Sequence, residues 1–162
     1  MARKAYTVGE ANALIPTLES VLVQIRARSK KIEDGQEKLQ LLELLWGERV
    51  RDAANPDHAE FNGHREAIRN GVREIEEMIQ TGIASRGIRF PTGGLEQGLL
   101  DFPTTWRGRW VYLCWRMGEQ RITAWHEVDG GFAGRQPLTT DQARRMGLED
   151  DPAHVDDSML DF

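Results

Sequence analysis

An apolar residue recurs at every seventh position through the first third of this chain. Seven-residue spacing is typical of a helix that packs along one face against another element. A helix with this stripe from residue 17 to residue 53 would be roughly 55 Å long. The positions in the stripe are Ala11, Leu18, Ile25, Ile32, Leu39 and Trp46.

Local signals predict where this helix begins and where it is interrupted. Thr7 followed three residues later by Glu10 has the spacing of a capping box, so a helix should begin there. Pro16 removes a backbone donor inside the pattern, which predicts a short first helix ending near Ile15, or a kink, before the long helix. The companion apolar stripe weakens at Gly35, where we expect a loose point at which the helix bends.

A second helix is expected after Asn55-Pro56-Asp57, because Asn can cap a helix and Pro is tolerated at its first position. Phe61, Ile68 and Ile75 repeat the seven-residue spacing, and the helix should end near Gly87. The two helices can pair antiparallel. Because the first is longer, its remaining apolar face needs the sheet or a second copy of the chain as cover.

After residue 87 the pattern changes to that of short β-strands at 88–90, 99–102, 109–116 and 121–127. Gly118 suits a tight hairpin turn that would pair 115 with 122, 113 with 124 and 111 with 126. This pairing sorts the side chains of the two strands onto two faces of the sheet. The first face should pack on the helices, and the second, which is amphipathic, is a candidate site or interface. The first face holds Val111, Leu113, Trp115, Ile122, Ala124 and His126, and the second Trp110, Tyr112, Cys114, Thr123, Trp125 and Glu127.

These elements predict an α+β protein in which a long antiparallel helical hairpin packs against a small antiparallel β-meander. Residues 1–147 would form one domain, with the hairpin at about 7–85 and the meander at about 87–138. Thr139 or Thr140 should cap a short C-terminal helix running through Met146. Residues 148–162 form an acidic tail without a periodic apolar face, which we expect to be disordered.

Charge and composition exclude several classes of protein. The net charge is -5, but residues 149–162 hold six acidic and no basic residues, which leaves 21 basic against 20 acidic residues (26 minus six) in the remainder. A nearly neutral body disfavours general nucleic-acid binding. There is no apolar run near the length of a membrane span and no secretory leader pattern, and there is one cysteine. We therefore expect a cytoplasmic protein with no membrane partner.

Several sequence blocks, in order, resemble a bacterial family catalogued as domain of unknown function 2203. They lie within about residues 6–138, so the resemblance covers most of the chain and leaves out the acidic tail. The resemblance implies no activity, because the family is uncharacterised. The blocks are Glu10-Ala11-Asn12-Ala13-Leu14-Ile15-Pro16, Leu100-Asp101-Phe102-Pro103, Val111-Tyr112-Leu113-Cys114-Trp115, Gly118-Glu119, Trp125-His126-Glu127 and Gly131-Phe132-Ala133-Gly134-Arg135-Gln136-Pro137-Leu138.

His126 is the residue most suggestive of chemistry, because Asp101, Glu127 and Asp129 lie near it in sequence. Histidine with carboxylates can hold a divalent metal ion, the one cofactor that the sequence suggests. Neighbouring strand residues point to opposite faces, however, so His126 and Glu127 are not expected to grip one ion unless the strand ends between them. The alternative is a buried histidine with a hydrogen bond.

Cys114 and His126 suggest a thiol nucleophile with its base. The expected register puts them on opposite faces of the sheet, which predicts that Cys114 is an inert core residue.

The glycine-rich loop offers a candidate anion or partner site. Gly131 and Gly134 could present backbone amides to an anion, and Arg135 could make a forked contact with it. The alternative is that the glycines serve tight turns and that Arg135 ties the loop to Asp101 or Glu127.

The tryptophans suggest two further uses of the sheet. Trp110 and Trp125, with Arg109, could stack the bases of a single-stranded nucleic acid. The alternative is that most of the tryptophans are core and that one or two cover a subunit interface.

The leading hypothesis is a non-catalytic, homodimeric interaction or binding protein. The alternatives are a metal-binding protein or metal-dependent hydrolase centred on His126, and a single-stranded nucleic-acid-binding protein that uses the Trp and Arg side chains of the sheet.

Overall fold

The computed structural model describes residues 3–160, and it has the α+β class that the sequence predicts. The chain divides into two compact units. We call residues 3–20 with 82–160 the sheet unit and residues 21–81 the hairpin unit. The first two residues of the N-terminal stretch and the last two of the acidic tail lie outside the described residues.

Helix α1 (Val8–Trp46) begins in the sheet unit and continues through the hairpin unit. Its start is confirmed, because the Thr7 hydroxyl accepts from the Glu10 amide (3.1 Å) and the Glu10 carboxylate accepts from the Thr7 amide (3.2 Å). The expectation that a helix ends near Ile15 is wrong, since α1 runs through Pro16 as a single helix. Ile15 and Leu18 are buried on either side of Pro16, and this burial offsets the one missing donor.

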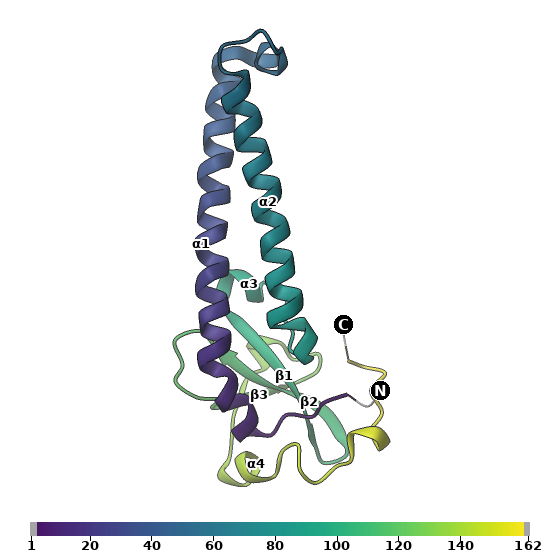
Figure 1. Ribbon diagram of the computed structural model, residues 1–162. Coiled ribbons are helices and arrows are strands. Elements are labelled where there is room, and N and C mark those ends of the chain that lie inside the picture. The colour runs from purple at the N-terminus through teal and green to yellow at the C-terminus, as the bar shows by residue number, and fades with distance from the viewer. Residues whose placement is uncertain (1–2, 161–162) are drawn as a thin grey trace. The chain divides into compact units, whose positions relative to one another are not determined.

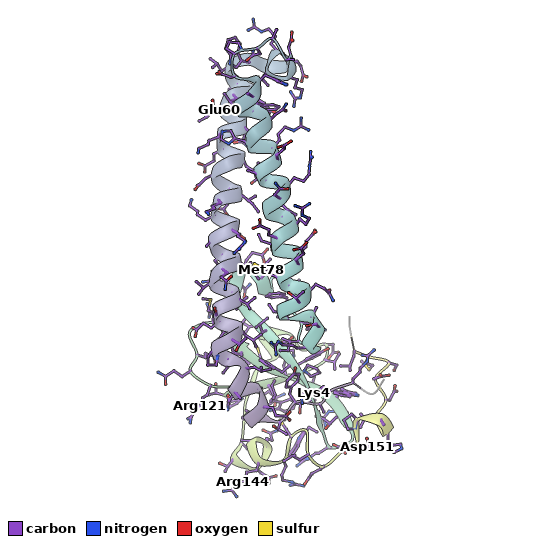
Figure 2. The ribbon with its side chains drawn as sticks, viewed as in Figure 1. Lys4, Glu60, Met78, Arg121, Arg144 and Asp151 are labelled. Atoms are coloured by element: carbon purple, nitrogen blue, oxygen red, sulfur yellow. The ribbon has the colours of Figure 1, made fainter. Side chains whose placement is uncertain are left out.

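In the hairpin unit, α1 and α2 (His58–Gly82) lie side by side and antiparallel (Figure 1). A 3₁₀ turn, Gly47–Arg51, lies in the connection between them. Figure 2 shows Glu60 at the end of the hairpin where the helices are joined and Met78 near the other end of α2.

Two glycines set how closely these helices approach. A Cβ at Gly35 would lie 3.2 Å from Ile68 Cγ1, and a Cβ at Gly71 would lie 3.1 Å from Ile32 Cγ1. Gly35, expected to mark a bend, is therefore a packing point inside an uninterrupted helix. An ion pair of 2.9 Å between Arg28 and Glu74 joins the helices in the same region.

The sheet is a four-stranded antiparallel meander in the order β1-β2-β3-β4, as predicted. Its strands are β1 (Leu99–Trp106), β2 (Arg109–Arg116), β3 (Ala124–Glu127) and β4 (Gln136–Pro137). β1 is longer than expected and turns into β2 at Arg107-Gly108, both with positive φ, as two-residue hairpin turns require. The strand expected at 88–90 is reduced to one bridge between Arg89 and Asp101. Helix α3 (Gly94–Gln97) precedes β1.

The register of β2 and β3 differs by one residue from the prediction. Val111 pairs with Glu127 and Tyr112 with His126, where 111 was expected to pair with 126. The predicted tight turn fails because residues 117–123 leave the ladder. The Ile122 amide donates to the Asn12 side chain of α1 (2.7 Å) instead. Because of this one-residue shift, the side chains of β3 lie on the opposite face, relative to β2, from the one predicted. One face of the sheet therefore holds Tyr112, Cys114, Ala124 and His126.

Both sides of the sheet are covered, so the predicted amphipathic face is not present. Trp106, Trp110, Trp115 and Trp125 are all at most 5% exposed. Leu160, from the acidic tail, packs on Trp110 and Tyr112, together with Ala5, Val128 and Val155.

The C-terminal segment begins with helix α4 (Thr140–Arg145), which Thr139 caps as one of the two predicted residues. A 3₁₀ turn, Pro152–His154, follows in the tail. The domain boundaries and the disorder of the tail stay predictions. Within the described part of the chain, no helix has both the length and the apolar character needed to cross a membrane.

Candidate metal centre

Three strands of the sheet bring Asp101, Cys114 and His126 together on one face. Asp101 of β1 pairs directly with Cys114 of β2. Cys114 pairs with Ala124 of β3, and His126 follows two residues later on the same side. One ligand atom from each side chain lies within 4.8 Å of the others. All three residues have no exposed surface.

The two ring nitrogens of His126 have different partners. Nδ1 lies 2.7 Å from the backbone oxygen of Glu127. A carbonyl oxygen only accepts, so Nδ1 carries a proton and donates it. Nε2 lies 2.9 Å from Asp101 Oδ1. A carboxylate oxygen and an unprotonated ring nitrogen both carry lone pairs, so a proton or a cation must lie between them.

The charge state of His126 follows from these contacts. Burial alone lowers the pKa of the ring, because it disfavours the imidazolium form. The hydrogen bonds to Asp101 and Cys114 act in the opposite direction and outweigh it, which raises the pKa of His126 to about 10. With no metal ion between Nε2 and Oδ1, the ring is therefore protonated at neutral pH.

Arg89 holds the other oxygen of the carboxylate. Its Nε lies 3.3 Å from Asp101 Oδ2, and its Nη2 donates to the backbone oxygen of Val128 (3.3 Å). The guanidinium lies over the Tyr112 ring, 3.9 Å from its centre. These contacts fix the carboxylate so that Oδ1 points at His126.

A pocket adjoins this arrangement at Arg89, whose side chain is about one fifth exposed. The pocket has a volume of about 450 Å³. Arg89 thus belongs both to the pocket wall and to the buried cluster. The pocket is lined by Arg89, Phe90, Pro91, Thr92, Val128, Asp129, Gly131 and Phe132.

Two of the four residues predicted to bind metal, Asp101 and His126, are in the cluster. Glu127 lies on the opposite face, as strand alternation predicts, and makes two bonds to Arg109 (2.5 and 3.1 Å). Those bonds lower the pKa of Glu127. Asp129 is exposed at the pocket wall.

Arg135 pairs with a different acid from those expected. It donates to both carboxylate oxygens of Glu119 (2.6 and 2.7 Å) and to the backbone oxygen of Cys114 (3.2 Å). Gly131 has a positive φ of 57°, and Gly134 ends the 3₁₀ turn Phe132–Gly134, so both serve the shape of the loop. Arg135 is thus engaged within the chain by an acid from the connection between β2 and β3.

Trp110 and Trp125, proposed for base stacking, are 4% and 5% exposed. Arg109 is engaged by Glu127. The described structure therefore presents no exposed ring from this pair on which a base could stack.

The expectation that Cys114 and His126 lie on opposite faces is wrong, since they share the buried cluster. Cys114 and Arg89 are the members of the arrangement that sequence reasoning missed. Cys114 would have been placed beside His126 if the predicted pairing of β2 and β3 had been shifted by one residue. Thiol catalysis still does not fit, because both nitrogens of His126 are occupied and no surface of Cys114 is exposed.

Comparison with protein families gives a match over most of the chain. The family model described as "Uncharacterized conserved protein (DUF2203)" matches residues 4–138, which include every residue of the cluster. Neither the curated proteins nor the solved structures contain a match to this chain.

Proposed function

The chain belongs to the DUF2203 family of uncharacterized conserved proteins, and we propose that it binds a divalent metal ion of the zinc type. The ligands are Asp101 Oδ1, Cys114 Sγ and His126 Nε2. The observation that carries the proposal is that one ligand atom from each of the three side chains lies within 4.8 Å of the others in a fully buried site.

The donor atoms favour zinc among the common divalent ions. Sulfur from cysteine, nitrogen from histidine and oxygen from a carboxylate are the set that zinc takes in proteins, whereas calcium and magnesium prefer oxygen alone. Zn–N and Zn–O bonds of about 2.1 Å in a tetrahedral site put the two donor atoms about 3.4 Å apart. Nε2 and Oδ1 are 2.9 Å apart, so a small movement of side chains accommodates the ion.

The contacts of His126 and Asp101 with neighbouring groups also support a metal site. Histidine ligands usually donate their second N–H to a backbone carbonyl or carboxylate, as Nδ1 of His126 does to Glu127. Carboxylate ligands are usually held by a further hydrogen bond, as Asp101 is by Arg89. The cluster thus supplies three of the four donors that a tetrahedral zinc ion takes, and two of these donors have such supports.

The proposed role is binding rather than hydrolysis. A hydrolytic zinc ion needs a coordination position that water and substrate can reach. Asp101, Cys114 and His126 have no exposed surface and do not line the pocket, whereas Arg89 does. We therefore propose a metal ion that stabilises the sheet by joining three strands.

The test is elemental analysis of protein purified without an affinity tag or chelator. Near-stoichiometric zinc in the wild type, lost in Cys114→Ala and in His126→Gln, is the expected result. The matched controls are Asp129→Asn and Glu127→Gln, which change nearby acids outside the cluster and should retain the metal. A metal-free wild type would overturn the proposal, and loss of metal in Asp129→Asn would point to a different ligand set.

Cobalt substitution gives a readout that folding alone does not supply. A cysteine thiolate bound to Co²⁺ produces a sulfur-to-metal charge-transfer band in the near ultraviolet. We expect this band in the wild type and its absence in Cys114→Ser, with both proteins folded by circular dichroism. A cobalt protein without the band would show that Cys114 is not a ligand.

We also propose, as a second function, that the protein associates with itself as a homodimer. The observation behind this is a group of three strongly exposed leucines on α1: Leu41, Leu44 and Leu45. Exposed apolar side chains gathered on one helix are typical of association surfaces. Light scattering that gives a monomer mass at every concentration up to about 100 μM, a range that covers weak interfaces, would exclude it.

A further inference from the structure

The distal part of α1 carries an apolar surface without cover among the described residues. We call Leu41, Leu44 and Leu45 the leucine patch. Their exposed fractions are 65%, 83% and 64%. On α1 in the hairpin unit, the half-buried positions instead follow the spacing of Ile32, Leu39 and Trp46. The leucine patch therefore lies on a different side of α1 from the stripe that packs in the hairpin.

Charged residues flank the leucine patch in an order that is self-complementary. Lys38, Leu41, Leu45 and Glu48 are spaced three, four and three residues apart, the spacing of one seam on a helix. Lys38 begins the seam and Glu48 ends it. Both are exposed. Among the described residues Lys38 forms no ion pair, and Glu48 has a 3.5 Å contact with Arg51.

We propose that two copies of the chain pair antiparallel along this seam. Leu41 of each copy packs on Leu45 of the other, and Lys38 of each lies beside Glu48 of the other. The same alignment sets Glu37 beside Arg49 of the second copy. The inference rests on the self-association proposed above and assigns it a surface, an orientation and a register.

The charges select this alignment over its neighbours. A parallel pair would place Lys38 against Lys38 and Glu48 against Glu48, which are repulsive contacts. An antiparallel pair shifted by one residue, with Leu41 against Leu44, would place Glu37 against Glu48. Of these three alignments, the proposed register alone matches leucine with leucine and opposite charges at both ends.

The size of the leucine patch indicates weak association. Three leucines from each copy bury less than the roughly 1,200 Å² that specific, stable complexes bury, so we expect a dissociation constant of about 10–100 μM. Exposed ion pairs add little affinity but discriminate between orientations.

Charge reversal tests the register by sedimentation equilibrium of the full chain. Lys38→Glu and Glu48→Lys should each raise the dissociation constant about tenfold, since each change creates two repulsive contacts in a symmetric pair. The double variant restores both contacts with exchanged signs and should return to within about threefold of the wild type. Lys31→Glu, an equal charge change one helical repeat away, is the matched control and should have no effect.

Mixed cross-linking tests the orientation. Disulfide formation under mild oxidation should join Leu41→Cys protein to Leu45→Cys protein in a mixture and should join neither variant to itself. A disulfide needs Cβ atoms about 4 Å apart, whereas like residues of this antiparallel pair are offset by four residues, about 6 Å along the axis, and Cys114 is buried. Cross-linking of each variant with itself would overturn the antiparallel pairing.

The outcomes separate this inference from the self-association on which it rests. A wild type that is monomeric throughout overturns both. A wild-type dimer that is insensitive to Lys38→Glu and gives no mixed cross-link overturns the seam alone and leaves self-association to another surface. Loss of the dimer in Leu41→Glu, with Leu148→Glu unchanged as an equally exposed control, supports the patch.

Discussion

At the scale of single residues, Asp101 shows how the neighbours of a side chain determine its chemistry. One oxygen faces Nε2 of His126 and the other faces Arg89. A carboxylate buried with a single partner would be costly, whereas two partners compensate both oxygens. In the proposed metal site, Arg89 would therefore orient a ligand without contacting the ion.

Removing Arg89 should weaken metal binding although all three ligands remain. Loss of a group that orients a ligand typically costs 10–100-fold in metal affinity, and we expect a loss of about that size for Arg89→Leu. Competition with a chromophoric chelator measures it. Arg109→Leu removes an arginine–carboxylate pair on the opposite face and should leave the affinity unchanged. Equal effects of the two changes would mean that Arg89 acts only through general stability.

Gly147 is a second position at which one residue constrains the structure. Its φ is 79°, and a Cβ there would lie 2.5 Å from the backbone oxygen of Tyr6. Gly108 also has a positive φ, of 75°, but no atom of the described residues lies within 4 Å of the position that a Cβ would take there. Comparing substitutions at the two glycines therefore distinguishes the effect of backbone strain alone from that of strain combined with steric overlap.

Gly147→Ala should therefore destabilise the protein by about 3 kcal/mol or more, because strain and overlap with a rigid backbone add. Gly108→Ala should cost about 1 kcal/mol, since it has the strain alone. Urea denaturation measures both. Similar losses for the two variants would contradict the close contact between Gly147 and Tyr6.

At the scale of elements, several predictions that depend on neighbouring residues are confirmed. The capping box at Thr7 and the cap at Thr139 are present, and the meander and the helical hairpin follow from periodicity. Pro16 misled the prediction because burial along α1 outweighs one lost hydrogen bond.

The β2–β3 register could not be predicted from local sequence. It depends on the bond between the Ile122 amide and Asn12, two residues 110 positions apart. A two-residue turn is the default for such a hairpin, and nothing near Gly118 signals the longer connection. That one-residue error placed Cys114 on the wrong face, so the candidate site was recovered only as Asp101 and His126.

The hairpin contains glycines that pack against the other helix and a glycine that faces open space, and substitutions at the two should have opposite effects on stability. Gly35→Leu should destabilise the protein by about 2 kcal/mol, because its side chain would overlap Ile68. Gly63 lies inside α2, and no atom of the described residues lies within 4 Å of the position that a Cβ would take there. Gly63→Ala should stabilise it by about 1 kcal/mol through helix propensity. Thermal unfolding with circular dichroism tests both, and a stabilising Gly35→Leu would contradict the packing of the helices.

At the scale of the whole molecule, the two proposals lie in different units. Asp101, Cys114, His126 and Arg89 belong to the sheet unit, and the leucine patch belongs to the hairpin unit. Every proposed ligand of the metal ion, together with Arg89, belongs to the sheet unit. Binding and association should therefore be separable by a change in the chain.

Replacing residues 28–74 with a short Gly-Ser turn tests this separation. The shortened protein should keep its zinc, because the change removes no ligand and no contact of Asp101, Cys114 or His126. It should be monomeric, because it lacks the leucine patch. Elemental analysis and light scattering on one preparation measure both. Loss of zinc from a folded shortened protein would contradict the independence of the metal site.

The paired contacts of Gly35 with Ile68 and of Gly71 with Ile32 bear on how the length of the hairpin can change during evolution. An insertion in one helix alone would shift every later contact out of phase with the other helix. Adding seven residues to both helices at the same level would keep the contacts facing each other. Hairpin lengths among relatives should therefore differ in matched steps of seven, while the sheet keeps its length.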